Sequence, residues 1–122
     1  MLALKLLQLA DGIIRRPDGV MVGRWPRAAA ALGRQSIESS LVAYWQQVEP
    51  SIAVSSKRAQ LLSLPVYFPD EELAEQVYST WASLSRVCHY HPYELPPTEP
   101  ELRNMLAVAA EFANTVASER LS

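Results

Sequence analysis

The chain has 122 residues, 49% of them hydrophobic and 20% charged, with a formal net charge of −2. These proportions are typical of one globular domain over residues 1–122, and they exclude a disordered chain and an indiscriminate nucleic-acid binder. One cysteine permits no internal disulfide and no apolar run approaches the roughly 20 residues that span a bilayer, so we expect a soluble cytoplasmic protein that contacts no membrane.

The first predicted element is an amphipathic helix over residues 1–16. Apolar residues recur there at spacings of four, three and four, which is the pattern of a helix face that packs on a core. They are Leu2, Leu6, Leu9 and Ile13. The segment is not expected to be a secretory signal, because its charge lies inside the apolar run and no small-residue cleavage pattern follows.

A long second helix is predicted over residues 26–48. It follows a turn at residues 17–19 and a short extended piece at 20–24, and its proline is tolerated in the first helical turn. Its expected core stripe is Ile37, Leu41, Tyr44, Trp45 and Val48. The small residues from Ala28 to Gly33 let another backbone come close, either within the chain or between two copies.

A third, shorter helix is predicted from Ser55 or Ser56 to Leu64, with Pro65 ending it. Its inward residues are expected to be Ala59, Leu61 and Leu62. Residues 66–68 are expected to form an apolar link whose aromatic side chains anchor the loop on the core.

The fourth helix begins at a strong start signal, residues 69–72, where acidic side chains face the positive helix end. Its stripe is Leu73, Val77, Trp81, Leu84 and Cys88. A proline-rich connector over residues 92–97 favours extended backbone.

Thr98 and Glu101 then form a T-x-x-E capping box that starts a fifth helix. Its stripe is Leu102, Met105, Leu106, Ala109, Phe112, Ala113 and Val116. The predicted fold class is therefore an all-α bundle of four to five helices with short connections.

Both histidines and the single cysteine lie within residues 88–91. We expect no metal site and no cofactor there, because Cys88 and His89 point about 100° apart on a helix and a closed zinc site needs four converging ligands. Cys88 could be a nucleophile with histidine neighbours, but its place on the helix stripe favours a buried, unreactive thiol.

Arg86 and His91 are the candidate catalytic pair. Arg86 falls on the polar face of the fourth helix, and His91 precedes Pro92 and is therefore biased out of the helical conformation. A guanidinium stabilises charge on phosphate oxygens, and an imidazole moves a proton near neutral pH. In RNA the 2′-hydroxyl can be the nucleophile, so neither a metal nor a protein nucleophile is required. A surface arginine and a histidine at a helix C-terminus are the structural alternative.

The segment Arg86-Val87-Cys88-His89-Tyr90-His91 resembles the R-x4-H motif of HEPN domains, small all-α proteins of which many are metal-independent ribonucleases. The long second helix, with Arg34-Gln35-Ser36-Ile37 near its middle, looks like the early HEPN helix, and the resemblance covers residues 26–118. It implies that Arg86 binds and polarises the scissile phosphate and that His91 acts in proton transfer or orients the 2′-hydroxyl. His89, Tyr90 and Arg34 are candidates for substrate binding.

The resemblance also implies a homodimer in which two motif helices line one cleft. Some members are toxins that a nucleotidyltransferase-type antitoxin partner holds inactive, and others are noncatalytic dimerisation or partner-binding modules. Val87 follows the motif arginine where active members commonly have a polar residue, which favours the noncatalytic alternative.

The distribution of charge is compatible with either role. Residues 1–60 carry eight Lys or Arg and four Asp or Glu, whereas residues 61–122 carry three and nine. Such a chain can present a local basic face to phosphates or pair its two faces in self-association. Two solvated faces of a helical domain are the simpler alternative.

Overall fold

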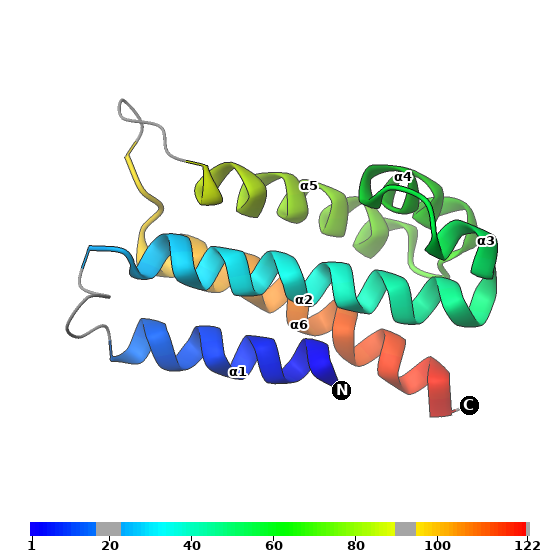
Figure 1. Cartoon of the computed structure of the whole chain (residues 1–122), viewed down its shortest axis with the longest axis horizontal. Coiled ribbons are helices and arrows are strands. Elements are labelled where there is room, and N and C mark those ends of the chain that lie inside the picture. Colours follow the sequence, from blue (N-terminus) through cyan, green and yellow to red (C-terminus); the bar gives the residue numbers. More distant parts are fainter. Residues whose placement is uncertain (17–22, 90–94, 122) are drawn as a thin grey trace.

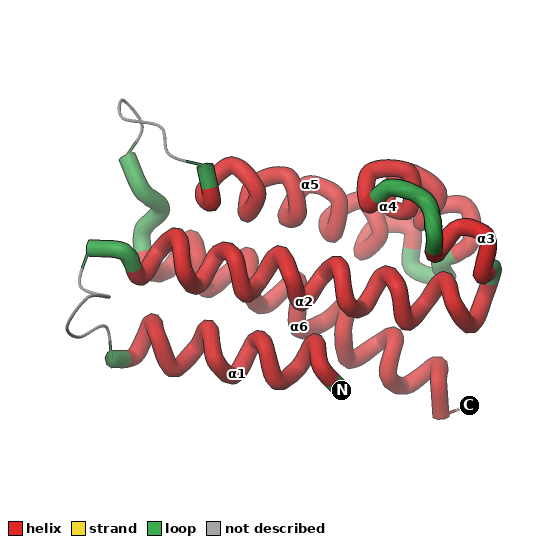
Figure 2. Tube along the Cα trace, in the orientation of Figure 1, coloured by secondary structure: helices red, strands yellow, loops and turns green. Residues whose placement is uncertain are grey.

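Helices make up most of the chain. The computed structural model describes residues 1–16, 23–89 and 95–121, and within these ranges it contains six helices and no strand (Figure 2). They are α1 (Leu2–Arg15), α2 (Trp25–Val48), α3 (Pro50–Ala53), α4 (Lys57–Tyr67), α5 (Glu71–Cys88) and α6 (Glu99–Leu121). This confirms the predicted all-α bundle and adds α3, a single turn that begins at Pro50. The predicted turn at 17–19, most of the extended piece at 20–24 and residues 92–94 of the connector lie outside the described residues.

Helix α2 is the centre of the bundle. It contacts each of the other five helices, and Figure 1 shows it between α1 and α5 with α6 behind it. Its side chains Ile37, Leu41 and Trp45 are fully buried, as the apolar spacing predicts. Val48 was predicted to be in the core but is 42% exposed. It is the last residue of α2, at the end of the helix.

The predicted apolar face of α1 is wrong by one position around the helix. The buried residues are Ala3, Ala10 and Ile14, whereas Leu2 and Leu9 are about 60% exposed. Small side chains let the α1 backbone approach α2 closely, and at the point of approach the Ser36 hydroxyl of α2 donates to the carbonyl oxygen of Ala3 at 3.0 Å. A leucine on that face would hold the two helices apart.

The small-residue run of α2 is used within the chain. Ala29 and Ala30 are fully buried, and a Cβ added to Gly33 would lie 2.6 Å from Leu106 Cδ2 and 3.3 Å from Leu84 Cδ1. Gly33 therefore marks the place where α5 and α6 both come close to α2. Of the two predicted uses, the described residues show packing between helices of one chain.

Two predictions about α4 are wrong. Pro65 does not end the helix, which continues to Tyr67, because a proline near a helix end forfeits one backbone hydrogen bond but keeps a helical φ. Leu62 is 62% exposed, and only Leu61 and Leu64 of the leucines in α4 face the core. Phe68 does anchor the following link, since it is buried and packs edge-on against the rings of Tyr44 and Phe112.

The starts of α5 and α6 both have side-chain caps, and the cap of α6 is the one that the sequence predicts. The Leu73 N–H donates to Asp70 Oδ1 at 3.0 Å. At α6, the Glu101 N–H donates to Thr98 Oγ1 at 3.2 Å and the Thr98 N–H donates to Glu101 Oε1 at 3.0 Å, which is a reciprocal capping box. These caps fix where the two helices that flank the candidate site begin.

A salt bridge joins α1 to α6, and a second one within α6 holds the same arginine. Arg103 Nη1 of α6 lies 2.9 Å from Asp11 Oδ1 of α1, and its Nε lies 3.0 Å from Glu99 Oε1. The hydrogen bond from Arg103 is the main reason that the pKa of Asp11 is lowered, and the charge of Arg15 contributes. We call Asp11, Glu99 and Arg103 the α1–α6 clasp.

No helix in the described part of the chain combines the length and the apolar character that crossing a membrane requires.

Candidate functional site

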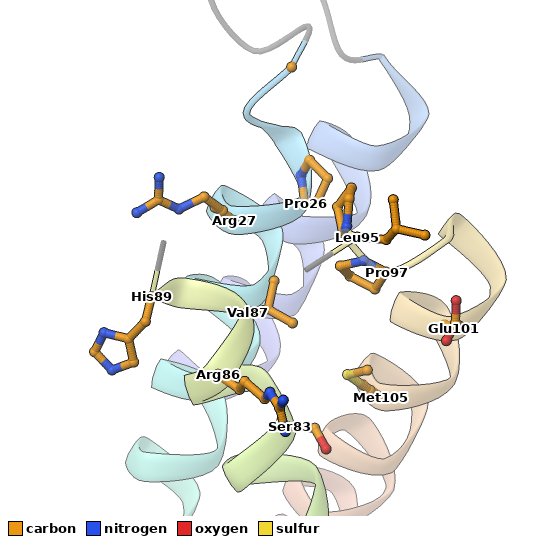
Figure 3. A pocket seen from close by; sticks show the side chains of 12 residues that line it. Pro26, Arg27, Ser83, Arg86, Val87, His89, Leu95, Pro97, Glu101 and Met105 are labelled. Atoms are coloured by element: carbon orange, nitrogen blue, oxygen red, sulfur yellow. The ribbon is translucent and has the colours of Figure 1, made fainter. Parts of the chain in front are cut away.

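A pocket of about 370 Å³ lies at the end of the bundle where α2 begins and α5 ends (Figure 3). Residues 95–97, which lead into α6, form its third side. The lining residues are Gly23, Pro26, Arg27, Ser83, Arg86, Val87, His89, Leu95, Pro96, Pro97, Glu101 and Met105. The lining therefore combines two arginines and a histidine with mainly apolar residues. The predicted motif arginine Arg86 and the predicted binding residue His89 are both among the lining residues.

Arg86 lies in the last turn of α5 and is exposed. A cation at this position is favourable, because the carbonyl groups at a helix C-terminus carry partial negative charge. Figure 3 shows its side chain directed along α5 towards Ser83, on the wall of the pocket.

His89 is the residue that follows the last residue of α5. Its backbone is extended (φ −89°, ψ 140°), and its N–H donates to the carbonyl oxygen of Arg86 at 3.2 Å. The imidazole is exposed and, in Figure 3, points away from the Arg86 side chain. Helix α5 thus ends at Cys88. The predicted catalytic residue His91 and the predicted binding residue Tyr90 both lie outside the described residues.

Arg27 is the pocket residue that sequence reasoning did not identify. It lies in the first turn of α2, and its Nη2 donates to the carbonyl oxygen of Cys88 at 3.1 Å. The bond satisfies one of the carbonyls that a helix C-terminus leaves unpaired. It also brings a second positive charge to the end of the motif helix. Local sequence patterns cannot predict this hydrogen bond, because Arg27 and Cys88 are 61 positions apart in the chain.

Val87 lies between these charged groups. It is partly buried against the core, and Figure 3 shows its side chain at the middle of the pocket, facing the Pro97 and Met105 side. In that view Arg27 lies above Val87, His89 to its left and Arg86 below it. The pocket therefore presents separated cations around an apolar centre.

Cys88 is half-buried and packs against the core, as the helix stripe predicts. Burial raises the pKa of its thiol, and the nearby charges of Arg34 and Arg27 only partly oppose that shift. The thiol is therefore protonated at neutral pH, which disfavours a role as nucleophile.

Arg34, the third predicted binding residue, lies beside the α2–α5 contact and does not line the pocket. Its Nε is 3.8 Å from Glu38 Oε2, too far for a hydrogen bond, and the same oxygen accepts a 3.4 Å hydrogen bond from Trp81 Nε1. The positive charge of Arg34 acts to lower the pKa of the Cys88 thiol, although burial outweighs it.

Glu101 is the acidic residue among those that line the pocket. Glu101 accepts the capping hydrogen bond from the Thr98 N–H, and this bond lowers the pKa of Glu101. The group is therefore charged at neutral pH and carries a negative charge at the α6 side of the pocket. In the described ranges, no three His, Cys, Asp or Glu residues come together in a way that could hold a metal ion.

No protein-family model, no curated protein and no solved structure matches this chain.

Proposed function

We propose that this chain is a HEPN-like, metal-independent endoribonuclease that binds an RNA phosphate at the pocket beside the end of α5. The observation that carries the proposal is the meeting of Arg27, Arg86 and His89 around one pocket, from the two helices that begin and end there. Arginine is well suited to phosphate, because its planar guanidinium can donate two parallel hydrogen bonds to phosphate oxygens. The apolar wall formed by Val87 and the prolines gives a base or ribose a surface to pack on.

In the proposed reaction the ribose 2′-oxygen attacks the adjacent phosphorus and the bond from phosphorus to the 5′-oxygen breaks. The products are a 2′,3′-cyclic phosphate and a free 5′-hydroxyl. Arg86 stabilises the charge that develops on the phosphate oxygens. His91 either accepts the proton of the 2′-hydroxyl or donates one to the leaving 5′-oxygen, and a water molecule makes the other proton transfer. Arg27 adds positive charge at the end of α5.

A homodimer belongs to this proposal, and so does the option of a nucleotidyltransferase-type antitoxin partner. The resemblance implies that two motif helices line one cleft. The exposed residues of α5 that lead to the pocket are mainly polar, among them Gln76, Ser79, Ser83 and Arg86. We therefore propose that each pocket works within one copy and that the pairing surface lies elsewhere on the molecule.

The test is cleavage of a mixed RNA pool in EDTA by the wild type and by two variants, Arg86→Ala and His91→Ala. Each substitution removes a group that acts on the reacting phosphate, so we expect the rate to fall by about 100-fold or more. Lys5→Ala, which removes an exposed cation from α1, is the matched control and should cleave like the wild type. Cleavage that neither Arg86→Ala nor His91→Ala affects would refute the proposal, as would no cleavage at any enzyme concentration.

The second candidate is a noncatalytic HEPN-like module for dimerisation or partner binding. It is favoured by Val87, whose apolar side chain lies at the centre of the pocket between the charged groups (Figure 3). Fluorescence anisotropy with an RNA whose 2′-hydroxyls are methylated separates the two candidates. Binding that Arg27→Ala and Arg86→Ala weaken supports an RNA site, whereas no binding by the wild type supports the noncatalytic module.

A further inference from the structure

Exposed apolar side chains gather around α4. The described chain has eight exposed large apolar residues, and Leu62, Val66 and Tyr67 belong to α4 while Val54 lies three residues before it. Leu62 is 62% exposed and Val66 is 82% exposed. A helix that covers the core on one face usually has polar residues on the other, so an apolar outer face indicates a contact with another molecule.

The exposed face of α4 has a definite order of charge. Arg58, Leu62 and Val66 are spaced by four residues and therefore lie on one face of the helix, and all three are exposed. We call them the α4 strip. Beyond its C-terminal end a link of three residues leads into α5, whose first two residues are Glu71 and Glu72. Along the chain, the exposed residues therefore run from basic through apolar to acidic.

This order opposes the macrodipole of α4. Its first turn carries Lys57 and Arg58 and no acidic residue, although the amide groups there already carry partial positive charge. Its last turn carries no basic residue. Within the described part of the chain, Arg58, Glu71 and Glu72 make no ion pair that would offset these charges.

The α4 strip has a basic residue at one end, and the acidic residues Glu71 and Glu72 follow its other end along the chain. Such an order complements a second copy of itself when the two copies run antiparallel about a two-fold axis. We propose that a second copy of this chain docks on the α4 strip in that orientation. Leu62 and Val66 of each copy pack against Val66 and Leu62 of the other. Arg58 of each copy then faces Glu71 and Glu72 of the other, which also places acidic groups near the positive end of each α4.

The contact is small and lies away from the pocket. An 11-residue helix is about 16 Å long, so the contact buries less than a standard interface and is dependent on concentration. Figure 1 shows α4 at the opposite end of the bundle from the end of α5. Pairing through α4 therefore leaves both pockets open, and the inference stands whether or not the chain cleaves RNA.

The first test is sedimentation velocity of the full chain from about 10 μM to about 1 mM, a range that spans weak association. The mass of the wild type should rise from 13.6 kDa towards twice that value. Leu62→Lys buries a charge in the contact and should raise the dissociation constant by more than about tenfold. Leu9→Lys on α1 is the matched control, since Leu9 is 59% exposed, and it should associate like the wild type.

The second test is a charge exchange. Arg58→Glu alone, and Glu71→Lys with Glu72→Lys, should each weaken association by bringing like charges together. The triple variant should restore it, which a general folding defect would not do. Circular dichroism should be unchanged, because all three positions are exposed.

Several outcomes would overturn the inference. They are a wild type that stays at 13.6 kDa throughout, a Leu62→Lys variant that associates normally, a Leu9→Lys variant that does not associate, or a triple variant without recovery. Monomeric protein that sediments with vesicles of anionic lipid through Leu62 would also overturn it, since the strip would then be a membrane-binding surface.

Discussion

Gly33 is the single residue on which the closest helix packing depends. A methyl group there would lie 2.6 Å from Leu106 Cδ2, which is closer than carbon atoms can approach, so Leu106 would have to shift. Alanine is better than glycine in a helix by about 1 kcal/mol, but overpacking a core costs about 1–3 kcal/mol. For Gly33→Ala we expect the cost of overpacking to exceed the gain in helix propensity, because the two leucines that the new methyl group would meet, Leu84 and Leu106, are both buried.

We therefore expect Gly33→Ala to lower the free energy of unfolding by about 1 kcal/mol in urea titrations. Gly12→Ala in α1 is the control, because a Cβ there meets nothing within 4 Å. It should stabilise the protein by about 0.5–1 kcal/mol. Equal effects of the two substitutions would contradict this account of Gly33.

At the scale of single elements, the capping box decides where α6 begins. Thr98 and Glu101 exchange hydrogen bonds of 3.2 and 3.0 Å, and Glu101 also lines the pocket. Thr98→Ala should cost about 1 kcal/mol in urea unfolding, because it leaves a first-turn N–H without its side-chain acceptor. Thr98→Ser keeps the hydroxyl and should retain most of the stability. A Ser variant as unstable as the Ala variant would show that the hydroxyl is not the stabilising group.

The α1–α6 clasp is the element contact that should respond to pH. The pKa of Asp11 is lowered in the folded state by Arg103 and Arg15. A lowered pKa means that the contribution to stability is present above the unfolded pKa, about 3.9, and is lost as pH falls through the folded pKa.

Asp11→Asn should therefore be less stable than the wild type at pH 7, and the difference should shrink and vanish as pH falls below about 4. Thermal unfolding at a series of pH values measures it. Glu111→Gln on α6 removes the same charge from an exposed residue without an ion pair in the described chain, and it should show a smaller difference. A constant Asp11→Asn difference down to acid pH would exclude the clasp as its cause.

At the scale of the whole molecule, α2 contacts every other helix, so loss of α2 should unfold all of them together. Urea transitions followed by circular dichroism, which reports all helices, and by fluorescence of Trp25, Trp45 and Trp81 should coincide. Ile37→Ala, at a fully buried position, should move both transitions equally and cost about 2–5 kcal/mol, and Ile37→Val about 0.5–1.5 kcal/mol. Helicity that persists after the tryptophan signal is lost would indicate a second unfolding unit.

Local patterns in the sequence were sufficient for the fold class, for most helix ends and for the buried stripes of α5 and α6. Leu73, Val77, Leu84, Leu102 and Phe112 are buried as their spacing predicts. Helical periodicity and capping depend on residues within one or two turns, so a single sequence contains them. The motif resemblance of residues 86–91 predicted Arg86 and His89 as site residues, and both line the same pocket.

The tertiary structure determined which faces of the helices are buried and which distant residues are in contact, because both depend on the distance between neighbouring backbones. It turned α1 so that Ala3 and Ala10, and not Leu2 and Leu9, face α2, because two helices approach most closely through small side chains. It exposed Leu62 and Val66 on α4, and it joined Arg27 to Cys88 across 61 positions of sequence. Apolar spacing along one helix cannot determine these contacts, because each depends on which neighbour the fold places there.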